Sequence, residues 1–174
     1  MVSSLWLWQL VGFSVTSLGG TLLHFLYDLT GGAAWTVPFS GVNESTWEHM
    51  KLLFWPMLIF ALIQSTAYRG RGDFWCIKLR GILLGIALIP LIFYIYNGAV
   101  GKSADWFNIS IFFIAAAAAY IYEARLFKKA EPICTYQRPA IVLLCIIALS
   151  FVVFSYVQPR INLFMDPTTG EFGA

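Results

Sequence analysis

The stretch Trp75–Asn97 reads WCIKLRGILLGIALIPLIFYIYN, and no charged side chain follows Arg80 within it. A run of about 20 mostly apolar residues is long enough to cross the hydrocarbon core of a bilayer as a helix. Lipid offers the backbone no hydrogen-bond partner, so the chain must satisfy its own N–H and C=O groups, which a helix does. This stretch therefore predicts a transmembrane helix.

Four further segments have the same character. They are approximately residues 5–27, 49–68, 106–127 and 139–158. The composition agrees, because 59% of the residues are hydrophobic and 11% are charged, against about 25% charged in a typical soluble domain. The sequence predicts an all-α integral membrane bundle of five transmembrane helices. It forms a single domain over residues 1–174, with a tail at 159–174.

Basic residues gather in two of the connections. Eight of the 11 Lys and Arg residues lie there: Arg69, Arg71, Lys78, Arg80, Arg125, Lys128, Lys129 and Arg138. The positive-inside rule places such loops in the cytoplasm. This predicts the N-terminus inside and the C-terminal tail outside, where most of the acidic residues and both histidines also fall.

One face of the first helix carries a polar stripe, Ser14, Ser17, Thr21, His24 and Asp28, spaced by three and four residues. Such spacing places side chains on one face of a helix, and a polar face is expected to point into the bundle interior or a water-filled cavity. Ser and Thr can also bond back to their own helix. His24 and Asp28, one turn apart, suggest an oriented imidazole or two ligands of one metal.

The segment Asn43–His49 (NESTWEH) precedes the second helix. Ser45 and Glu48 match a capping box, in which Glu48 would reach back to the N-cap. Capping leaves Glu44 and His49 unexplained. We expect the short first loop to bring both helix ends together, with His24, Asp28 and His49 as metal ligands and Glu44 or Glu48 as the catalytic base. Zn²⁺, Mn²⁺ or Fe²⁺ would suit such ligands.

The tail contains apolar residues and a turn-forming Asp166-Pro167. It is expected to fold back over the outer face as a lid, with Asn43 and Asp166 at the pocket. Cys76, Cys134 and Cys145 show no metal-ligand spacing, and their odd count favours free thiols over a disulfide framework.

Three pieces of the sequence, HFLYD at His24–Asp28, NESTWEH at Asn43–His49 and DPTTGEFG at Asp166–Gly173, together resemble an uncharacterised family of small prokaryotic multi-pass membrane proteins. Its members share an NES-x-WEH segment and a DP-x-TG-x-aromatic-Gly tail. The resemblance implies a prokaryotic inner or plasma membrane location and one common design for the outer segments. It implies no activity.

Three functions fit these observations, and whether the protein is an enzyme stays open. The first is a metal-binding membrane protein with an extracytoplasmic acidic and histidine site, such as a metal-dependent membrane hydrolase. The second is a small cation or solute transporter or channel that uses the polar stripe. The third is a protein that binds lipid or another hydrophobic ligand. Membrane lipid and a second copy of the chain are the expected partners; nothing in the sequence indicates a nucleotide cofactor or nucleic acid.

Overall fold

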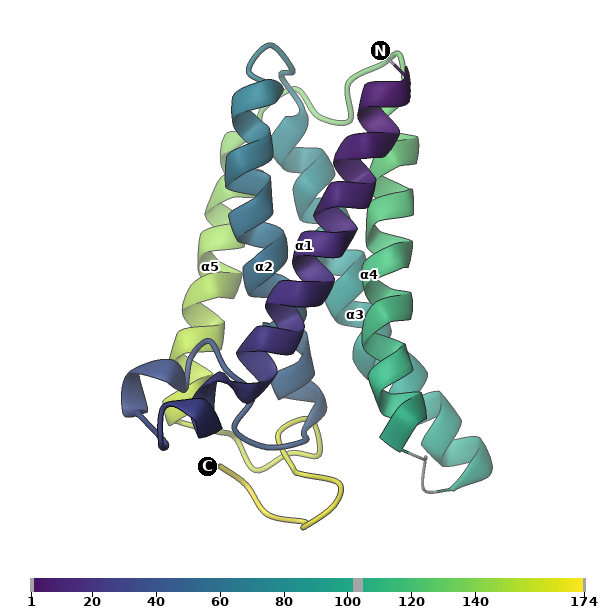
Figure 1. Ribbon diagram of the computed structural model, residues 1–174. Coiled ribbons are helices and arrows are strands. Elements are labelled where there is room, and N and C mark those ends of the chain that lie inside the picture. The colour runs from purple at the N-terminus through teal and green to yellow at the C-terminus, as the bar shows by residue number, and fades with distance from the viewer. Residues whose placement is uncertain (1, 102–104, 174) are drawn as a thin grey trace.

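The computed structural model of the chain describes residues 2–101 and 105–173. Its long helices are α1 (Val2–Leu29), α2 (Thr46–Ala67), α3 (Phe74–Val100), α4 (Asp105–Phe127) and α5 (Arg138–Tyr156), with a short 3-10 helix, η1 (Ala34–Thr36), in the first loop (Figure 1). These five long helices are all long and apolar enough to cross a membrane. The predicted all-α architecture with five candidate spans is therefore confirmed.

The helices run up and down, so the two termini lie at opposite ends of the bundle (Figure 1). We call them the N-terminal end, which holds the α2–α3 and α4–α5 loops, and the C-terminal end, which holds the α1–α2 loop and the tail. Helix α2 packs against α1 and α3, while α3 also packs against α4 and α5. Helices α1 and α4 lie close together near the N-terminal end and diverge toward the C-terminal end (Figure 1).

Small residues allow the close packing of α3 on α4 and α2. Gly81 lies against the Glu123 side chain, and Gly85 lies against Leu53 and Ala119. On α4, Ala115 and Ala119 are completely buried and form part of its packing face. The GxxxG pattern of Gly81 and Gly85 thus serves helix packing within one chain.

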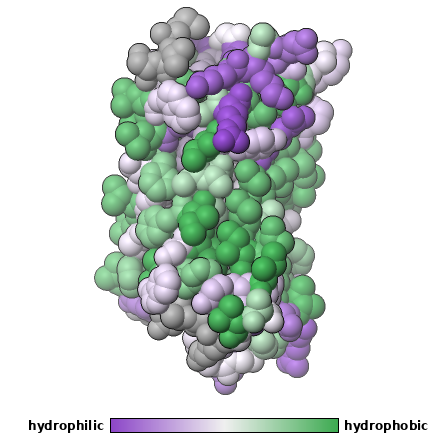
Figure 2. All heavy atoms as spheres, turned by 90° about the vertical axis from the view of Figure 1, so that its right-hand side faces the viewer, coloured by the Kyte–Doolittle hydropathy of each residue, from purple (hydrophilic) through white to green (hydrophobic). Residues whose placement is uncertain are grey.

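On the face shown in Figure 2, hydrophobic residues cover the middle of the bundle, and hydrophilic residues gather toward the N-terminal end. Helices α1 and α5 are the least buried of the five candidate spans. Exposed apolar side chains on them include Leu10, Leu18, Ile146 and Leu149. In a bilayer these side chains would contact lipid, which is why so many can be exposed without cost.

The connections at the N-terminal end are cross-linked. A disulfide joins Cys76, at the start of α3, to Cys134 in the α4–α5 loop. Nearby, the Asp73 carboxylate pairs with Arg71 at 2.7 Å and accepts a hydrogen bond from the Ile133 N–H. The expectation of free thiols is therefore wrong for two of the three cysteines. The odd count misled because the third, Cys145, is a free thiol on the exposed side of α5.

Candidate functional site

The α1–α2 loop is held against the end of α1 by one serine. The Ser40 hydroxyl donates to the Leu23 carbonyl at 2.6 Å and accepts from the Tyr27 N–H at 2.8 Å. This places Gly41 against the His24 ring, where an added Cβ would lie 3.2 Å from Nδ1. The loop therefore passes directly beside His24 before it enters α2.

The start of α2 has one of the two predicted capping contacts. Ser45 is the N-cap and its side chain accepts from the Glu48 N–H at 3.4 Å. The predicted return contact from Glu48 is wrong, because the Ser45 N–H donates to Asn43 Oδ1 instead. The Ser45 carbonyl also lies 2.9 Å from His49 Nδ1. That contact orients the imidazole so that its Nε2 is free to face the loop.

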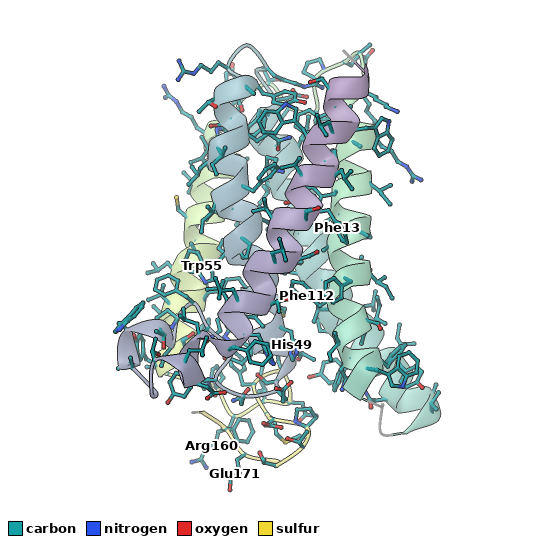
Figure 3. All side chains as sticks on the ribbon, in the orientation of Figure 1. Phe13, His49, Trp55, Phe112, Arg160 and Glu171 are labelled. Carbon is teal, nitrogen blue, oxygen red and sulfur yellow. A yellow bond between two sulfur atoms is a disulfide. The ribbon has the colours of Figure 1, made fainter. Side chains whose placement is uncertain are left out.

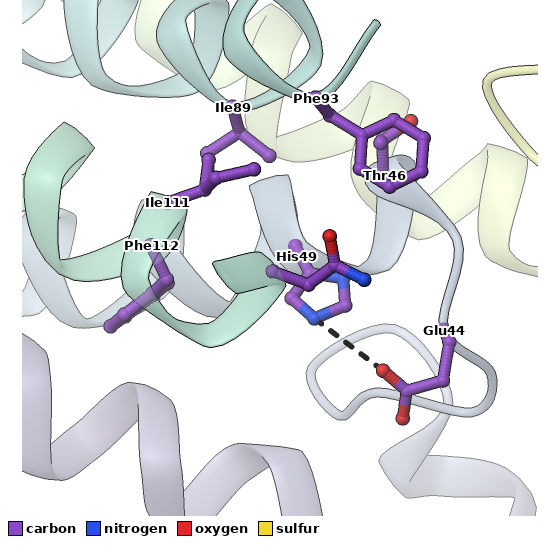
Figure 4. A pocket seen from close by; sticks show the side chains of 8 residues that line it. Glu44, Thr46, His49, Ile89, Phe93, Ile111 and Phe112 are labelled. Atoms are coloured by element: carbon purple, nitrogen blue, oxygen red, sulfur yellow. Dashed lines mark ion pairs between the residues drawn. The ribbon is translucent and has the colours of Figure 1, made fainter. Parts of the chain in front are cut away.

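Glu44 lies between the two imidazoles. Its Oε1 is 3.6 Å from His24 Nε2, and its Oε2 is 3.6 Å from His49 Nε2. The two ring centroids are 6.0 Å apart. We call His24, Glu44 and His49 the His–Glu–His cluster. It joins residues of α1, the loop and α2, and Figure 4 shows the ion pair of His49 with Glu44.

The cluster is partly open to its surroundings. The exposed fraction of the side chain is 49% for Glu44, 31% for His24 and 16% for His49. A proton can therefore reach the carboxylate, while His49 is shielded by the protein. The Glu44 carboxylate can accept a hydrogen bond from either imidazole or from a donor group of a bound molecule.

Two cavities border His49. The smaller, of about 20 Å³, also touches Glu44, Thr46 and Phe93 (Figure 4), and it has room for about one water molecule. The larger, of about 170 Å³, is lined by Gly20, Thr21, His24, Phe25, His49, Leu52, Ile109, Phe112 and Phe113. His49 and Phe112 lie between the diverging halves of α1 and α4 (Figure 3).

The larger cavity, which we call the lateral cavity, is apolar except at the two histidines and Thr21. Its rim residues Phe25, Ile109 and Phe113 are exposed on the outside of the bundle. They belong to α1 and α4, two of the candidate membrane spans. The lateral cavity therefore opens sideways, toward the surface that lipid would cover, and has the cluster at one end.

Two predicted site residues lie away from the cluster. Asp28 is exposed, and its carboxylate makes no contact with His24. Glu48 is fully buried, where its Oε2 pairs with Lys51 at 2.7 Å and accepts from the Val42 N–H at 3.0 Å. A carboxylate in such a pair has no access to a substrate in the lateral cavity. Of the two candidate catalytic glutamates, only Glu44 stands beside the imidazoles.

The polar stripe of α1 faces the protein only in part: Thr21 and His24 line the lateral cavity and the Ser17 hydroxyl is buried. Ser14 and Thr21 are exposed, and each hydroxyl bonds back to a carbonyl four residues earlier. The interior face of α1 instead carries Gln9, Thr16 and Gly20, which are buried. The hydroxyls of Ser14 and Thr21 are therefore satisfied by their own helix rather than by a polar path through the bundle.

The C-terminal tail packs over the start of α2. Its Leu163 carbonyl accepts from the Trp47 N–H at 3.0 Å, and its Gly173 carbonyl accepts from Asn43 Nδ2 at 2.9 Å. Asp166 Oδ2 accepts from the Glu44 N–H at 3.2 Å. Asn43 and Asp166 thus hold the backbone that presents Glu44, rather than lining the lateral cavity.

Hydrogen bonds hold Asp166 in its charged form. Burial alone would raise the pKa of this carboxyl. The Thr168 hydroxyl, with backbone N–H groups that include that of Glu44, outweighs burial and brings the pKa below its ordinary value. A carboxylate that stays ionised to lower pH than an ordinary Asp therefore lies next to the segment that carries Glu44.

The metal prediction has limited geometric support. Over residues 2–101 and 105–173, no group of three or more His, Cys, Asp or Glu side chains is arranged to hold a metal ion. His24, Glu44 and His49 do not meet that arrangement. They are spaced as an ion-paired cluster, with each imidazole 3.6 Å from the carboxylate.

Sequence reasoning missed three contributors to the site. Lys51 could have been found, since it follows Glu48 by three residues and such pairs meet on a helix. Ser40 gave no sign, because a loop serine has many uses. Phe112 and its neighbours on α4 were hidden among other apolar residues, and only the helix packing brings them to the histidines.

Comparison with known proteins gives a family but no function. The family model described as a family of unknown function (DUF6512) matches residues 1–174, so the chain belongs to that family. No curated protein and no solved structure matches the chain. The functional argument therefore rests on the site itself.

Proposed function

We propose that this member of the family binds an amphipathic membrane molecule. The apolar part would occupy the lateral cavity, and a hydrogen-bonding head would contact the His–Glu–His cluster. The observation that carries the proposal is a cavity lined by rings and aliphatic side chains, with two imidazoles and a carboxylate at one end. Ligand sites typically combine an apolar lining with a few converging polar groups in this way.

The size of the lateral cavity restricts the ligand. A volume of about 170 Å³ is smaller than the roughly 300–1,000 Å³ of pockets that enclose drug-sized molecules. It suits the head and first carbons of a longer molecule whose remaining chain lies along α1 and α4 in the bilayer. The exposed apolar rim of Phe25, Ile109 and Phe113 supports entry from the side.

The chemistry of the head follows from the cluster. Glu44 is an acceptor and carries negative charge, while each imidazole can donate or accept a proton. A primary amine or a hydroxyl can bond to both kinds of group. An amine or hydroxyl head is therefore favoured over a carboxylate or phosphate, which Glu44 would repel.

Cavity filling tests this proposal with a matched pair of variants. Ile109 and Ile114 are both exposed residues of α4, but only Ile109 lines the lateral cavity. A long-chain alkylamine with a fluorophore at its far end serves as the probe. Binding to the wild type that is lost in Ile109→Trp and kept in Ile114→Trp supports the proposal. Equal binding by both variants would exclude the lateral cavity.

A metal-dependent hydrolase is the second candidate. It is favoured by the two imidazole Nε2 atoms that face one carboxylate, a donor set that zinc, manganese or iron accepts. Metal-bound water would supply the nucleophile. Metal analysis of the purified protein tests it: bound metal that His49→Ala abolishes supports the site. A metal-free wild type whose stability a chelator leaves unchanged would eliminate it.

We also infer a prokaryotic cell membrane location with the C-terminal end outside. The two basic connections lie at the N-terminal end, which favours that end in the cytoplasm. The disulfide argues the other way, because Cys76 and Cys134 lie at the same end and cytoplasmic thiols are usually reduced. We base the orientation on the bias of the basic residues, because it involves eight side chains, whereas the disulfide is a single bond. A reporter fused to the C-terminus that is active only outside the cytoplasm tests it.

A further inference from the structure

A layer of buried polar side chains crosses the bundle near its N-terminal end. Helices α1 to α4 each contribute one residue, namely Gln9, Gln64, Lys78 and Glu123, and none of the four is more than 3% exposed. Lys78 Nζ lies 2.5 Å from Glu123 Oε2. We call these four residues the polar layer.

A neighbouring ring contact shows that the four residues share one level. Gly12 of α1 lies against the rings of Phe60 and Tyr120, since a Cβ added to it would be 2.6 Å and 2.5 Å from their nearest atoms. Gln9, Gln64 and Glu123 are displaced from these three residues by one turn toward the N-terminal end, on the same helix faces. Lys78 Nζ joins them at 5.2 Å from the Tyr120 ring and 5.9 Å from the Phe60 ring.

Most polar atoms of the layer have no partner within the protein. Both amide atoms of Gln9, both of Gln64 and Oε1 of Glu123 are buried without a hydrogen bond to any residue that the structure describes. A buried polar atom left unpaired costs about 1–3 kcal/mol. Five such atoms in one layer would consume much of the stability of a domain. A ligand that satisfies them is the simpler physical account.

Apolar clusters close the polar layer on both sides. Toward the N-terminal end lie Phe74, Ile77, Leu126 and Phe127, which form one buried cluster. Toward the middle lie the rings of Phe60 and Tyr120. The four residues of the polar layer are buried, so lipid around the bundle cannot reach them to form hydrogen bonds. The partner must therefore be small and held within the bundle.

We propose that the polar layer is an internal water-binding site that joins the Gln9 and Gln64 amides to the Lys78–Glu123 ion pair. The ion pair is neutral overall, so a cation would be repelled by Lys78 and an anion by Glu123. Water both donates and accepts, as two amides and a carboxylate oxygen require. Polar residues inside a membrane commonly mark such hydrated regions.

This hydrated layer is separate from the His–Glu–His cluster. One turn further toward the middle of the bundle, the Tyr120 hydroxyl lies 2.8 Å from Thr16 Oγ1. Beyond that point the Phe112 ring contacts Gly20 and forms an apolar barrier before the lateral cavity. The proposed water site therefore does not depend on the proposed amphipathic ligand, and each can be tested separately.

Hydroxyl-radical footprinting by X-ray radiolysis tests the proposal, because bound water yields radicals where it sits. The full chain is irradiated in nanodiscs, and two phenylalanines of α2 are compared. Phe60 borders the polar layer and is 2% exposed, while Phe54 is fully buried against the rings of Trp55 and Phe151. We expect Phe60 to be oxidised severalfold faster than Phe54. Equal rates in the wild type would overturn the proposal without any variant.

A substitution then identifies the groups that hold the water. In Gln9→Leu/Gln64→Leu, which removes both amides, oxidation of Phe60 is expected to fall to the rate of Phe54. The single variant Gln64→Leu, which keeps more of the native packing, is expected to give part of this fall. Phe60 oxidation that remains at the wild-type rate in both variants would show that the amides hold no water.

Discussion

Each end of the bundle contains a buried lysine–glutamate pair, and the two pairs differ in how they are completed. At the C-terminal end, Lys51 Nζ contacts Glu48 at 2.7 Å, the Val37 carbonyl at 2.7 Å and the Ser155 hydroxyl at 3.0 Å. These are three acceptors for the three protons of an ammonium group. Lys51 thereby joins α2, the first loop and α5.

At the N-terminal end, Lys78 bonds to Glu123 and otherwise faces the rings of Phe60 and Tyr120. Each pair leaves one buried carboxylate oxygen, Glu48 Oε1 or Glu123 Oε1, without a partner among the described residues. The pairs differ at the lysine, because Lys78 has one oxygen acceptor where Lys51 has three. The same pair of residue types therefore contains a fully bonded lysine at one end and, within the polar layer, an incompletely bonded lysine at the other. The comparison shows that the partners around a buried ion pair, rather than the pair alone, decide its role.

The largest expected effect comes from breaking the completed pair. Lys51→Met leaves the Glu48 carboxylate buried without its counter-charge, and removing one partner of a buried ion pair costs about 3–5 kcal/mol. The free energy of unfolding in mixed micelles measures this loss. The first loop should loosen with it, because the Val37 carbonyl loses its donor.

Paired replacements separate the two ends. Glu48→Met/Lys51→Met removes both charges but still leaves the Val42 N–H and the Val37 carbonyl without partners, so we expect it to remain destabilised. Lys78→Met/Glu123→Met removes an ion pair with fewer outside bonds, and such replacements are often neutral or stabilising by about 1–4 kcal/mol. The same loss of stability in both double variants would show that the two ion pairs do not differ in their contribution to the fold.

The second prediction concerns the disulfide at the N-terminal end. Cys76→Ser/Cys134→Ser is expected to cost about 2–4 kcal/mol, since the bond closes a loop between cysteines 58 positions apart. Cys145→Ser removes the exposed free thiol and serves as the control, with no change expected. Unfolding with and without reductant gives the same comparison in the wild type. A reductant that changes nothing would mean that the two thiols are unpaired in the protein.

The third prediction uses the charge of Asp166 at the C-terminal end. Its pKa is lowered by hydrogen bonds that outweigh burial, so its stabilisation is present above the ordinary pKa of Asp, near 3.9, and is lost as the pH falls further. Asp166→Asn should cost about 1.5–3 kcal/mol at pH 7, the range for hydrogen bonds to a charged group. The difference from the wild type should shrink below about pH 4.

Glu171→Gln provides the control for this prediction, because Glu171 is an exposed carboxylate of the same tail. It should leave the melting temperature unchanged across the same pH range. A difference between Asp166→Asn and wild type that stays constant down to pH 3 would show that the charge of Asp166 does not hold the tail.

Much of the fold could be predicted because lipid imposes simple rules on sequence. Length and apolarity identified all five helices, and Ser45 correctly predicted an N-cap at the start of α2. The polar stripe misled because Ser14 and Thr21 satisfy their hydroxyls within their own helix. Periodicity identifies a helix face, but it does not say whether that face points to lipid or to another helix.

The candidate site was harder to predict because its geometry is set by a loop. Glu44 lies before the N-cap, so helix periodicity says nothing of its direction, and Ser40 and Gly41 place it beside His24. Glu48 has the right spacing for a capping box, but its carboxylate forms an ion pair with Lys51 instead. The apolar half of the site, from α4, carries no distinguishing residue and becomes visible only when the helices are packed.

The smallest effect is expected where the sequence predicted a large one. Asp28 follows His24 by one turn, yet its side chain is exposed and makes no contact with the imidazole. Asp28→Asn should therefore change the free energy of unfolding by less than about 0.5 kcal/mol, as is usual for surface substitutions. It should also leave binding of the fluorescent alkylamine unchanged.

Glu44→Gln is the matched comparison for Asp28→Asn, since it makes the same chemical change at a carboxylate that touches both imidazoles. We expect it to weaken alkylamine binding while Asp28→Asn does not. The difference would show that Glu44, which the first loop places beside the imidazoles, contacts the amine head. Equal losses in the two variants would instead restore the pair of His24 and Asp28 that the spacing along α1 suggests, and would require the end of α1 to rotate when ligand binds.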